Sequence, residues 1–340
     1  ADGEHLYTTE TDVETGASVV GVRHARTLEK LAEWPTHGID AHELIWDLHS
    51  PGGPTLLVAN GGVPTAPETG RSKRDLHRMD SSLVRLDAPV KGRCVVLAGS
   101  LDHPDGKTLP LLFAADAARE LGARKVGLVA PYLAYMRQDK RFKPGEAVTS
   151  RSYARLLSGA LDFLVTVDPH LHRWRSLDEI YTMPTTVVAA APLVARWLAR
   201  QLPQPLLIGP DSESAQWVGE VARLAGAPWT VMAKTRRGDR EVTVRLAETG
   251  PWPGHTPVLL DDIVSTGQTL VAAAVALAKA GLPAPVCVAV HALFDAEALA
   301  RLKAAGIRRV VTCDTIAHPS NAIRLAAPLA LAVRDLARQV

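Results

Sequence analysis

Short apolar runs alternate with amphipathic segments from Pro54 to the end of the chain. Runs of roughly four to eight residues rich in Val, Ile and Leu predict buried strands, and longer segments with apolar positions three or four apart predict helices. The expected strands are 55–59, 93–100, 125–132, 163–167, 185–190, 205–208, 229–233, 241–246, 257–260, 285–293 and 309–313. The expected helices are 109–122, 150–160, 191–202, 212–226, 268–281, 296–306 and 326–338. This alternation predicts an α/β fold of parallel sheets flanked by helices.

The first 53 residues do not continue this alternation. We expect a strand at 17–22 and, from its spacing, a helix at 26–34 that Pro35 would stop. We assign residues 1–53 no function. The Gln-Leu-Pro-Gln-Pro stretch at 201–205 marks an expected boundary between an N-terminal domain, 54–202, and a C-terminal domain, 203–340, whose last helix is free to pack back on the first.

Composition excludes some classes of protein. The chain of 340 residues has 38 Lys and Arg against 36 Asp and Glu, a net charge of +2, which argues against a general binder of nucleic acid or of membrane surfaces. The three cysteines are far apart and lie in or beside apolar runs, which indicates small buried side chains in a reducing compartment. No apolar run reaches the ~18 residues needed to cross a bilayer. We therefore expect a cytoplasmic protein.

Candidate chemistry begins where the apolar run 257–260 ends. Two carboxylates, Asp261 and Asp262, follow the run, and a loop of small and hydroxyl-bearing residues leads from them into an Ala-rich helical pattern. Backbone N–H groups and hydroxyls at a helix N-terminus suit a phosphate. The two acids suit the hydroxyls of a ribose, or a metal-bound sugar, beside it. The alternative is an ordinary buried strand before an Asp-capped helix.

Three further segments follow expected strands, where α/β folds place function. The loop 131–146 is rich in cations and contains Arg-Gln-Asp, which favours an anion site over a merely solvated basic loop. His170 and Asp211 follow two other strands and could hold Mg²⁺ with nucleotide phosphates, although a lone His170 could equally be a cap or core histidine. The cationic tip 234–240 is either solvated or closes over a reacting phosphate.

Taken together and in this order, these segments resemble the ribose-phosphate pyrophosphokinases, which make phosphoribosyl diphosphate (PRPP). The resemblance runs from Pro54 to the C-terminus and is most specific at 131–146, 167–170 and 259–269, the last being the PRPP loop shared with type I phosphoribosyltransferases. Lys234-Thr235-Arg236 and Ser265 are closest in form to the shorter archaeal-like members. The resemblance implies two phosphoribosyltransferase-like (type I) α/β domains, Mg²⁺ dependence, a homo-oligomer, and transfer of the β,γ-diphosphoryl group of ATP to O1 of ribose 5-phosphate, giving PRPP and AMP.

The resemblance also implies a role for each matching residue. Catalytic cations would be Lys234 and Arg236. ATP would be bound by Arg137, Gln138 and Asp139, and Mg²⁺ by His170 and Asp211. Ribose 5-phosphate would be bound by Asp261, Asp262, Ser265, Thr266, Gly267, Gln268 and Thr269.

The chain departs from the family pattern at four places, one of which is the first 53 residues, which have no counterpart in the family. Segment 76–85 lacks the Gly and Glu of the family's Phe-x-Asp-Gly-Glu element, which leaves the base of the phosphate donor open. Gln268 stands where a glycine is common, and Pro169 stands where a leucine is common. The missing acids and the N-terminal segment keep open a non-catalytic regulator or sensor of nucleotides and sugar phosphates. The shared PRPP loop keeps open a phosphoribosyltransferase that consumes PRPP, although the matched segment 131–170 argues against it.

Overall fold

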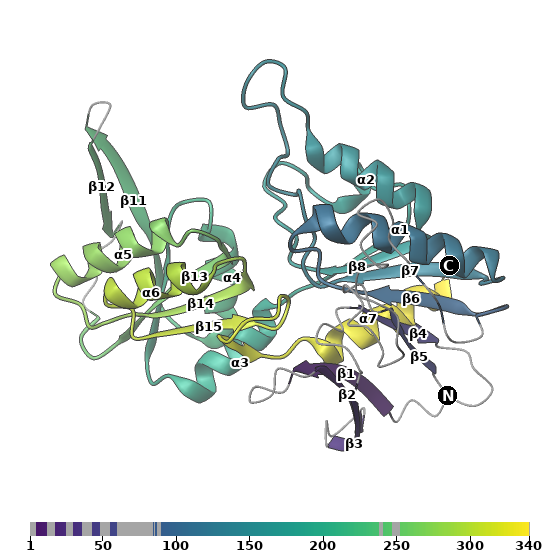
Figure 1. Cartoon of the computed structure of the whole chain (residues 1–340). Coiled ribbons are helices and arrows are strands. Elements are labelled where there is room, and N and C mark those ends of the chain that lie inside the picture. The colour runs from purple at the N-terminus through teal and green to yellow at the C-terminus, as the bar shows by residue number, and fades with distance from the viewer. Residues whose placement is uncertain are drawn as a thin grey trace, which may run out of the picture. The chain divides into compact units, whose positions relative to one another are not determined.

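A computed structural model of the chain describes the backbone at 5–11, 18–24, 30–35, 43–47, 55–59, 84, 86, 90–237, 241–246 and 252–339. Its side chains are described at 84, 86, 90–233 and 252–339. The chain forms two compact units (Figure 1). The first comprises Ala1–Thr166, Arg173–Val187 and Ala326–Val340, and the second comprises Val167–His172 and Val188–Leu325.

This division differs from the single boundary expected at 201–205, because the chain passes between the units more than once. Helix α3 (Ala191–Gln201) packs on α4 (Ala215–Ala225) and so belongs to the second unit. The final helix, α7 (Ala326–Gln339), packs on β7 (Lys125–Ala130) of the first unit.

The first unit is built on a six-stranded sheet in the order β5-β4-β6-β7-β8-β9. Strands β6 (Cys94–Ala98), β7 and β8 (Phe163–Val167) are parallel and buried, as their apolar runs predict. Strand β9 (Thr185–Val188) forms one edge. Helices α1 (Pro104–Glu120) and α2 (Thr149–Ala160) lie on one face of this sheet and α7 lies on the other (Figure 1).

Two strands at the other edge of this sheet run antiparallel to their neighbours. Strand β4 (Glu43–Asp47) pairs antiparallel with both β6 and β5 (Thr55–Ala59). The sequence predicted β5 but gave no element at 43–47. Near the N-terminus, β1 (His5–Thr11), β2 (Ser18–His24) and β3 (Lys30–Pro35) form a separate antiparallel sheet. The helix predicted at 26–34 is therefore wrong. A helix of this length is only marginally stable by itself, and the backbone at 30–35 pairs with β2 instead.

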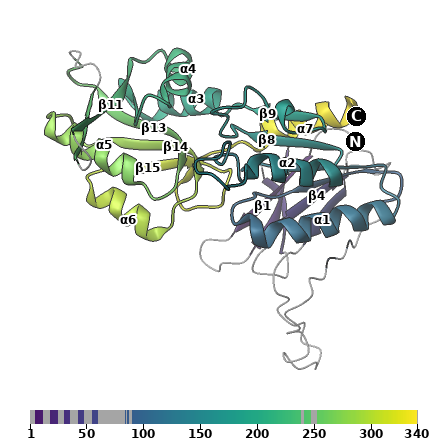
Figure 2. The same ribbon diagram turned by 90° about the horizontal axis from the view of Figure 1, so that it is seen from above.

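The second unit is built on a seven-stranded sheet in the order β12-β11-β10-β13-β14-β15-β16. Its central strands, β10 (Pro205–Gly209), β13 (Thr256–Val264), β14 (Val286–Ala292) and β15 (Arg309–Cys313), are parallel, and short β16 (Asn321–Ile323) forms one edge. Strand β11 (Trp229–Arg237) joins β10 in parallel and β12 (Glu241–Leu246) in the predicted antiparallel hairpin. Helices α3 and α4 cover one face, and α5 (Gln268–Lys279) and α6 (Ala296–Ala304) cover the other (Figure 2).

The core of the second unit places functional groups at one edge of its sheet. Leu206 and Ile208 of β10 pack with Leu259 of the neighbouring β13 and with the Ala-rich face of α5. Because adjacent parallel strands end at the same edge, Asp211 after β10 and the acids of β13 lie near each other. Both units thus have the predicted α/β architecture. Among the described residues, every helix is too short or too polar to cross a membrane.

Candidate active site

Strand β13 continues through the two acids at its carboxyl end. It ends at Val264, whereas the sequence predicted an end at Leu260, because pairing with β14 persists to Val264. The carboxylate Oδ1 of Asp261 accepts the N–H of Asp262 at 3.0 Å, and that of Asp262 accepts the N–H of Ile263 at 2.8 Å. The acids are therefore held by the sheet itself, which fixes them more rigidly than a loop would.

The loop from β13 to α5 is short and tightly packed. Its Gly267 has φ 72°, a left-handed conformation that favours glycine, and a Cβ there would lie 3.1 Å from the Leu302 side chain. Among the described residues, no side chain caps α5 and no acid lies in its first turn. Its N-terminal N–H groups and positive dipole end therefore suit an anion.

The other residues predicted to hold the phosphate all lie in this loop or the first turn of α5. Ser265 and Thr269 are half-buried, and Thr266 is exposed. Gln268 is exposed as well, so the side chain that replaces a common glycine is not packed inside the loop.

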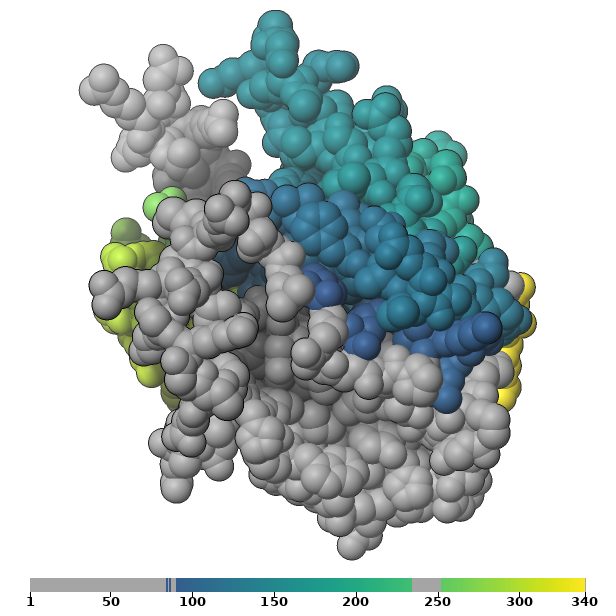
Figure 3. Space-filling view, turned by 45° about the vertical axis from the view of Figure 1, so that its right-hand side comes forward, coloured from purple at the N-terminus to yellow at the C-terminus, as the bar shows by residue number. Residues whose placement is uncertain are grey.

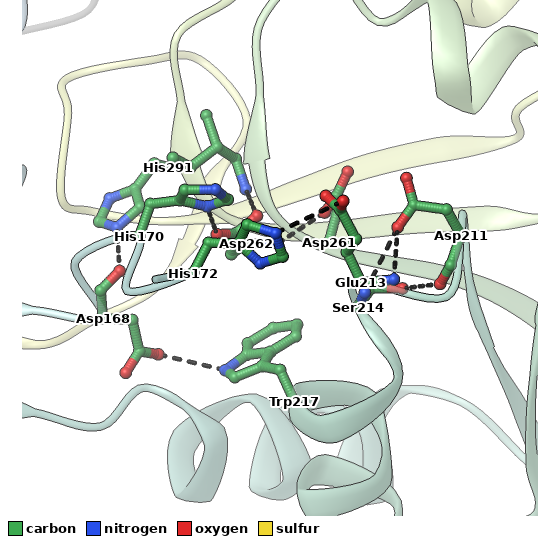
Figure 4. Close-up of polar contacts among 11 residues, drawn as sticks. Asp168, His170, His172, Asp211, Glu213, Ser214, Trp217, Asp261, Asp262 and His291 are labelled. Atoms are coloured by element: carbon green, nitrogen blue, oxygen red, sulfur yellow. Dashed lines mark hydrogen bonds and ion pairs between the residues drawn. The ribbon is translucent and has the colours of Figure 1, made fainter. Parts of the chain in front are cut away.

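The acid pair is joined to His170, which comes from the loop after β8 (Figure 4). His170 Nδ1 lies 2.6 Å from Asp262 Oδ2. Burial and the neighbouring Asp262 carboxylate raise the pKa of Asp261 well above its ordinary value. Burial also acts to raise the pKa of Asp262, but its hydrogen bond to His170 and the attraction of that ring outweigh burial and lower it. The negative charge of Asp262 is therefore stabilised by His170, whereas a negative charge on Asp261 would need a further hydroxyl donor or cation to stabilise it.

Asp211 shapes the turn that leads into α4. Its Oδ1 accepts the backbone N–H groups of Glu213 at 3.1 Å and Ser214 at 3.3 Å, and the Ser214 hydroxyl donates to its carbonyl at 2.7 Å (Figure 4). The Asp211 charge also contributes to the raised pKa of Asp261. Three of the predicted sets, the phosphate loop, the acid pair and the His170–Asp211 pair, thus lie in one unit.

The Arg-Gln-Asp segment lies in the first unit, between β7 and α2. The loop between β7 and α2 projects from the unit in Figure 1 and forms the raised teal region of Figure 3. Arg137 is exposed, and the Gln138 carbonyl accepts the Ser150 hydroxyl at 3.1 Å. Asp139 is buried and accepts from Arg173 Nη1 at 2.8 and 3.1 Å. Asp139 therefore anchors the segment, whereas Arg137 is presented to solvent.

Comparisons with known proteins identify the family. The chain is 35% identical to a ribose-phosphate pyrophosphokinase of Methanopyrus kandleri over 75% of this chain and 87% of that protein. It is 32% identical to the ribose-phosphate pyrophosphokinase of Methanothermobacter thermautotrophicus over 74% and 87%. The chain belongs to the ribose-phosphate pyrophosphokinase family. It is therefore an enzyme, a transferase of the kinase type, as its sequence predicted.

Family models and a solved structure agree with this membership. A model for the N-terminal domain of ribose phosphate pyrophosphokinase matches residues 68–160, and a phosphoribosyl transferase domain model matches 176–326. The crystal structure of phosphoribosylpyrophosphate synthetase from Mycobacterium smegmatis superposes with a TM-score of 0.66 at 25% identity, over 76% of this chain and 87% of that one. Residues 1–101 match a family of proteins of unknown function, DUF1513, which adds no role for the first 53 residues.

Sequence reasoning missed three side chains around this candidate site. Asp168 lies in the motif 167–170 but has no predicted role, and Trp217 and His291 are not among the predicted residues. Trp217 Nε1 donates to Asp168 Oδ2 at 3.3 Å, and His291 Nε2 lies 3.2 Å from the Asp168 carbonyl. Burial raises the pKa of Asp168 to about 6. His291 did carry a signal, because it is a single polar residue in the otherwise apolar run of β14.

The predicted catalytic cations are only partly described. The backbones of Lys234 and Arg236 lie in β11, opposite Val244 and Val242 of β12. Their side chains lie outside the described residues, as does the segment 76–83 in which the Gly-Glu departure was noted. Their roles stay predictions.

Proposed function

We propose that the chain is a ribose-phosphate diphosphokinase that uses ATP and ribose 5-phosphate. The observation that carries this proposal is the loop at the start of α5, where no described side chain caps the helix N-terminus and an anion could bind. Directly before this loop lie two acids, of which Asp261 has a raised pKa and Asp262 a lowered one. A 5-phosphate on the loop 265–269 and ribose hydroxyls on Asp261 and Asp262 account for both features. In this proposal the C-terminal domain binds the sugar phosphate and the N-terminal domain binds the nucleotide.

The proposed reaction forms one bond and breaks one. O1 of ribose 5-phosphate attacks the β-phosphorus of ATP, the bond from that phosphorus to the α,β-bridging oxygen breaks, and AMP leaves while O1 loses its proton. Such a transfer needs positioning and charge neutralisation more than a nucleophilic side chain. The rigid acids and the loop would position the sugar, and Lys234 and Arg236 would neutralise the transferring diphosphoryl group.

The donor set suits Mg²⁺ on the nucleotide phosphates. Among the described residues no cluster of three or more potential ligands is present, but Mg²⁺ commonly takes one or two protein groups and completes its shell with water and phosphate oxygens. His170 Nδ1 bonds to Asp262, so Nε2 is the ring atom that would face the metal, and a carboxylate on the second nitrogen is usual for ligating histidines. We propose His170 and Asp211 as the ligands. The bound ion would spread the negative charge of the triphosphate.

On the nucleotide side we propose contacts from Arg137 and Gln138. An exposed arginine can fork onto phosphate oxygens, and Gln138 is held in place through its carbonyl by Ser150. Asp139, which the family resemblance groups with them, would act on ATP through the loop that its bond to Arg173 fixes.

A coupled turnover assay tests the proposal. Purified protein is mixed with ribose 5-phosphate, Mg²⁺ and each common nucleoside triphosphate, and PRPP and nucleoside monophosphate are detected. We expect turnover that falls about a thousandfold in Lys234→Ala, by analogy with other catalytic cations, and that is unchanged in Lys303→Ala, an exposed lysine on α6. Binding of both substrates without turnover would refute the proposal and indicate a regulator. The donor ranking would show what the changed segment 76–85 does to base selection.

We also propose that the enzyme is a homo-oligomer. Leu109 and Phe113 on α1 and Leu156 on α2 are 56%, 43% and 46% exposed, which supports an apolar surface that a second copy could cover. Sedimentation velocity would test this, and a monomer at micromolar concentration would refute it.

A further inference from the structure

The turn that carries His170 has an unfavourable backbone at Asp168. Asp168 has φ 29°, on the positive side that non-glycine residues avoid. It also precedes Pro169, whose ring restricts the conformations of the residue before it. Such a conformation persists only where surrounding contacts impose it.

Contacts from several elements hold Asp168 in this conformation (Figure 4). Its N–H donates to the Val188 carbonyl at 3.2 Å, and its Oδ2 accepts the Ala190 N–H at 3.0 Å and Trp217 Nε1–H at 3.3 Å. Its carbonyl is held by His291 of β14, whose Nε2 is 3.2 Å away. Of these contacts, only the one from His291 acts on the carbonyl, the group that sets the direction of the chain toward Pro169 and His170.

The contact of His291 with the Asp168 carbonyl defines the tautomer of its ring. A carbonyl oxygen only accepts, so the proton on His291 lies on Nε2. The other ring nitrogen, Nδ1, lies 2.9 Å from the Thr315 hydroxyl, whose single proton can go either to Nδ1 or to the Val290 carbonyl, which is also 2.9 Å away. The side chain is 1% exposed, and burial lowers its pKa to about 4, so the ring is neutral at neutral pH. A neutral ring with Nε2–H donates to the Asp168 carbonyl, and its Nδ1 can accept the Thr315 proton when that proton turns away from Val290.

We propose that His291 is a positioning residue of the active site: its Nε2–H holds the Asp168 carbonyl, and this fixes the turn on which His170 reaches Asp262. The metal-binding consequence rests on the proposed function, because it takes His170 as a ligand of Mg²⁺. The pairing of His170 with Asp262 is a property of the apoprotein and does not depend on that function.

Two amide substitutions separate the contacts of His291. In His291→Gln the side-chain amide nitrogen reaches about as far as Nε2 and can still donate to the Asp168 carbonyl. In His291→Asn the shorter amide reaches only to the position of Nδ1, where it keeps Thr315 and loses Asp168. Thr315→Val is the complementary control, since it removes the Nδ1 partner, together with the bond of that hydroxyl to the Val290 carbonyl, and leaves the Nε2 contact intact.

The first measurement is made on the apoprotein by ¹H–¹⁵N correlation of the histidine rings, with His170→Ala used to assign the His170 signals. We expect the ring nitrogen shifts of His170 to be unchanged in His291→Gln and Thr315→Val. In His291→Asn they should move toward those of a solvent-exposed histidine. Unchanged His170 signals in His291→Asn would overturn the inference. Equal changes in His291→Gln or Thr315→Val would overturn it too, since they would indicate general support of the core.

The second measurement is Mn²⁺ binding in the presence of ATP, followed by the electron paramagnetic resonance signal of free Mn²⁺. We expect roughly tenfold weaker Mn²⁺ binding in His291→Asn, the lower end of what losing an outer-shell partner costs. We expect less than threefold weaker Mn²⁺ binding in His291→Gln. Equal losses of Mn²⁺ affinity in His291→Gln and His291→Asn would overturn the positioning role. If His170→Ala binds Mn²⁺ like the wild type, the metal assignment of the proposed function fails, and the nuclear magnetic resonance result decides the inference alone. If His291→Asn does not fold, the other two variants still test it.

Discussion

Substituting Gly267 by alanine should weaken both the second unit and its affinity for sugar phosphate. The residue has φ 72° and lies between the acid-bearing strand and the first turn of α5. An alanine there must adopt a left-handed backbone, which costs about 1–2 kcal/mol for an L-residue. Its Cβ would also lie 3.1 and 3.3 Å from two carbons of Leu302, which is fully buried. Because that contact is tighter than normal, either Leu302 or the loop must move, and overpacking of this kind costs typically about 1–3 kcal/mol.

The chain offers a matched control at the other end of the same helix. Gly281 follows α5 with φ 76°, and nothing lies within 4 Å of a Cβ placed on it. Gly281→Ala therefore carries the same backbone cost without the contact to Leu302. We expect Gly281→Ala to lose about 1 kcal/mol of unfolding free energy and Gly267→Ala about 2–4 kcal/mol. The double variant Gly267→Ala with Leu302→Ala should recover part of the contact term, because the two substitutions share that contact.

Urea unfolding at equilibrium measures the stability of each variant, and calorimetric titration with ribose 5-phosphate measures its affinity. We expect Gly267→Ala to bind at least tenfold more weakly than the wild type, since a shift of the loop moves the N–H groups that would receive the phosphate. Gly281→Ala should bind within a factor of two of the wild type. The reasoning is refuted if the two alanine variants lose the same stability and both keep wild-type affinity.

Three further predictions follow from other parts of the structure. In Gly127→Ala the new Cβ would lie 2.0 Å from the ring of Phe163, so we expect the variant to lose at least about 3 kcal/mol of stability or not to fold. A thermal scan measures this, and an unfolding transition at the wild-type temperature would contradict this packing of β7 on β8. Arg173→Ala leaves the buried carboxylate of Asp139 unpaired, so we expect the free energy of unfolding to fall by about 2 kcal/mol, less than for a fully buried pair because Arg173 is 38% exposed. The KM for ATP in the turnover assay should rise, and an unchanged KM would argue against the anchoring role of Asp139. Burial raises the pKa of Asp168 from 3.8 to about 6, so its contribution to stability is complete below pH 4 and is lost as pH rises through 6, by about 3 kcal/mol at pH 7. In urea unfolding, Asp168→Asn should become more stable relative to the wild type over that pH range. A stability difference that does not depend on pH would refute this prediction.

The local pattern of the sequence was sufficient for the architecture of both units from β6 onward. Buried parallel strands and their covering helices have periods that a short window contains, so the strands 163–167 and 309–313 were predicted to the residue. The β13–α5 loop was also found from sequence, because its acids, its glycine and its helix start are consecutive. Strand direction was harder: a short apolar run such as 55–59 looks the same whether its neighbour runs parallel or antiparallel, and here β5 pairs antiparallel with β4.

Only the tertiary structure decided which distant groups meet. His170 and Asp262 are 92 residues apart, and His291 and Asp168 are 123 apart, so their hydrogen bonds depend on strand order and register. The same holds for Asp139, which the sequence placed among residues that bind ATP and which the fold pairs with Arg173. A local pattern records which face of an element is apolar, but a polar side chain acquires its partner only when two elements pack together. The sequence by itself therefore determined the family, the α/β architecture and the residue types of the site. The sheets decided how those residues are held.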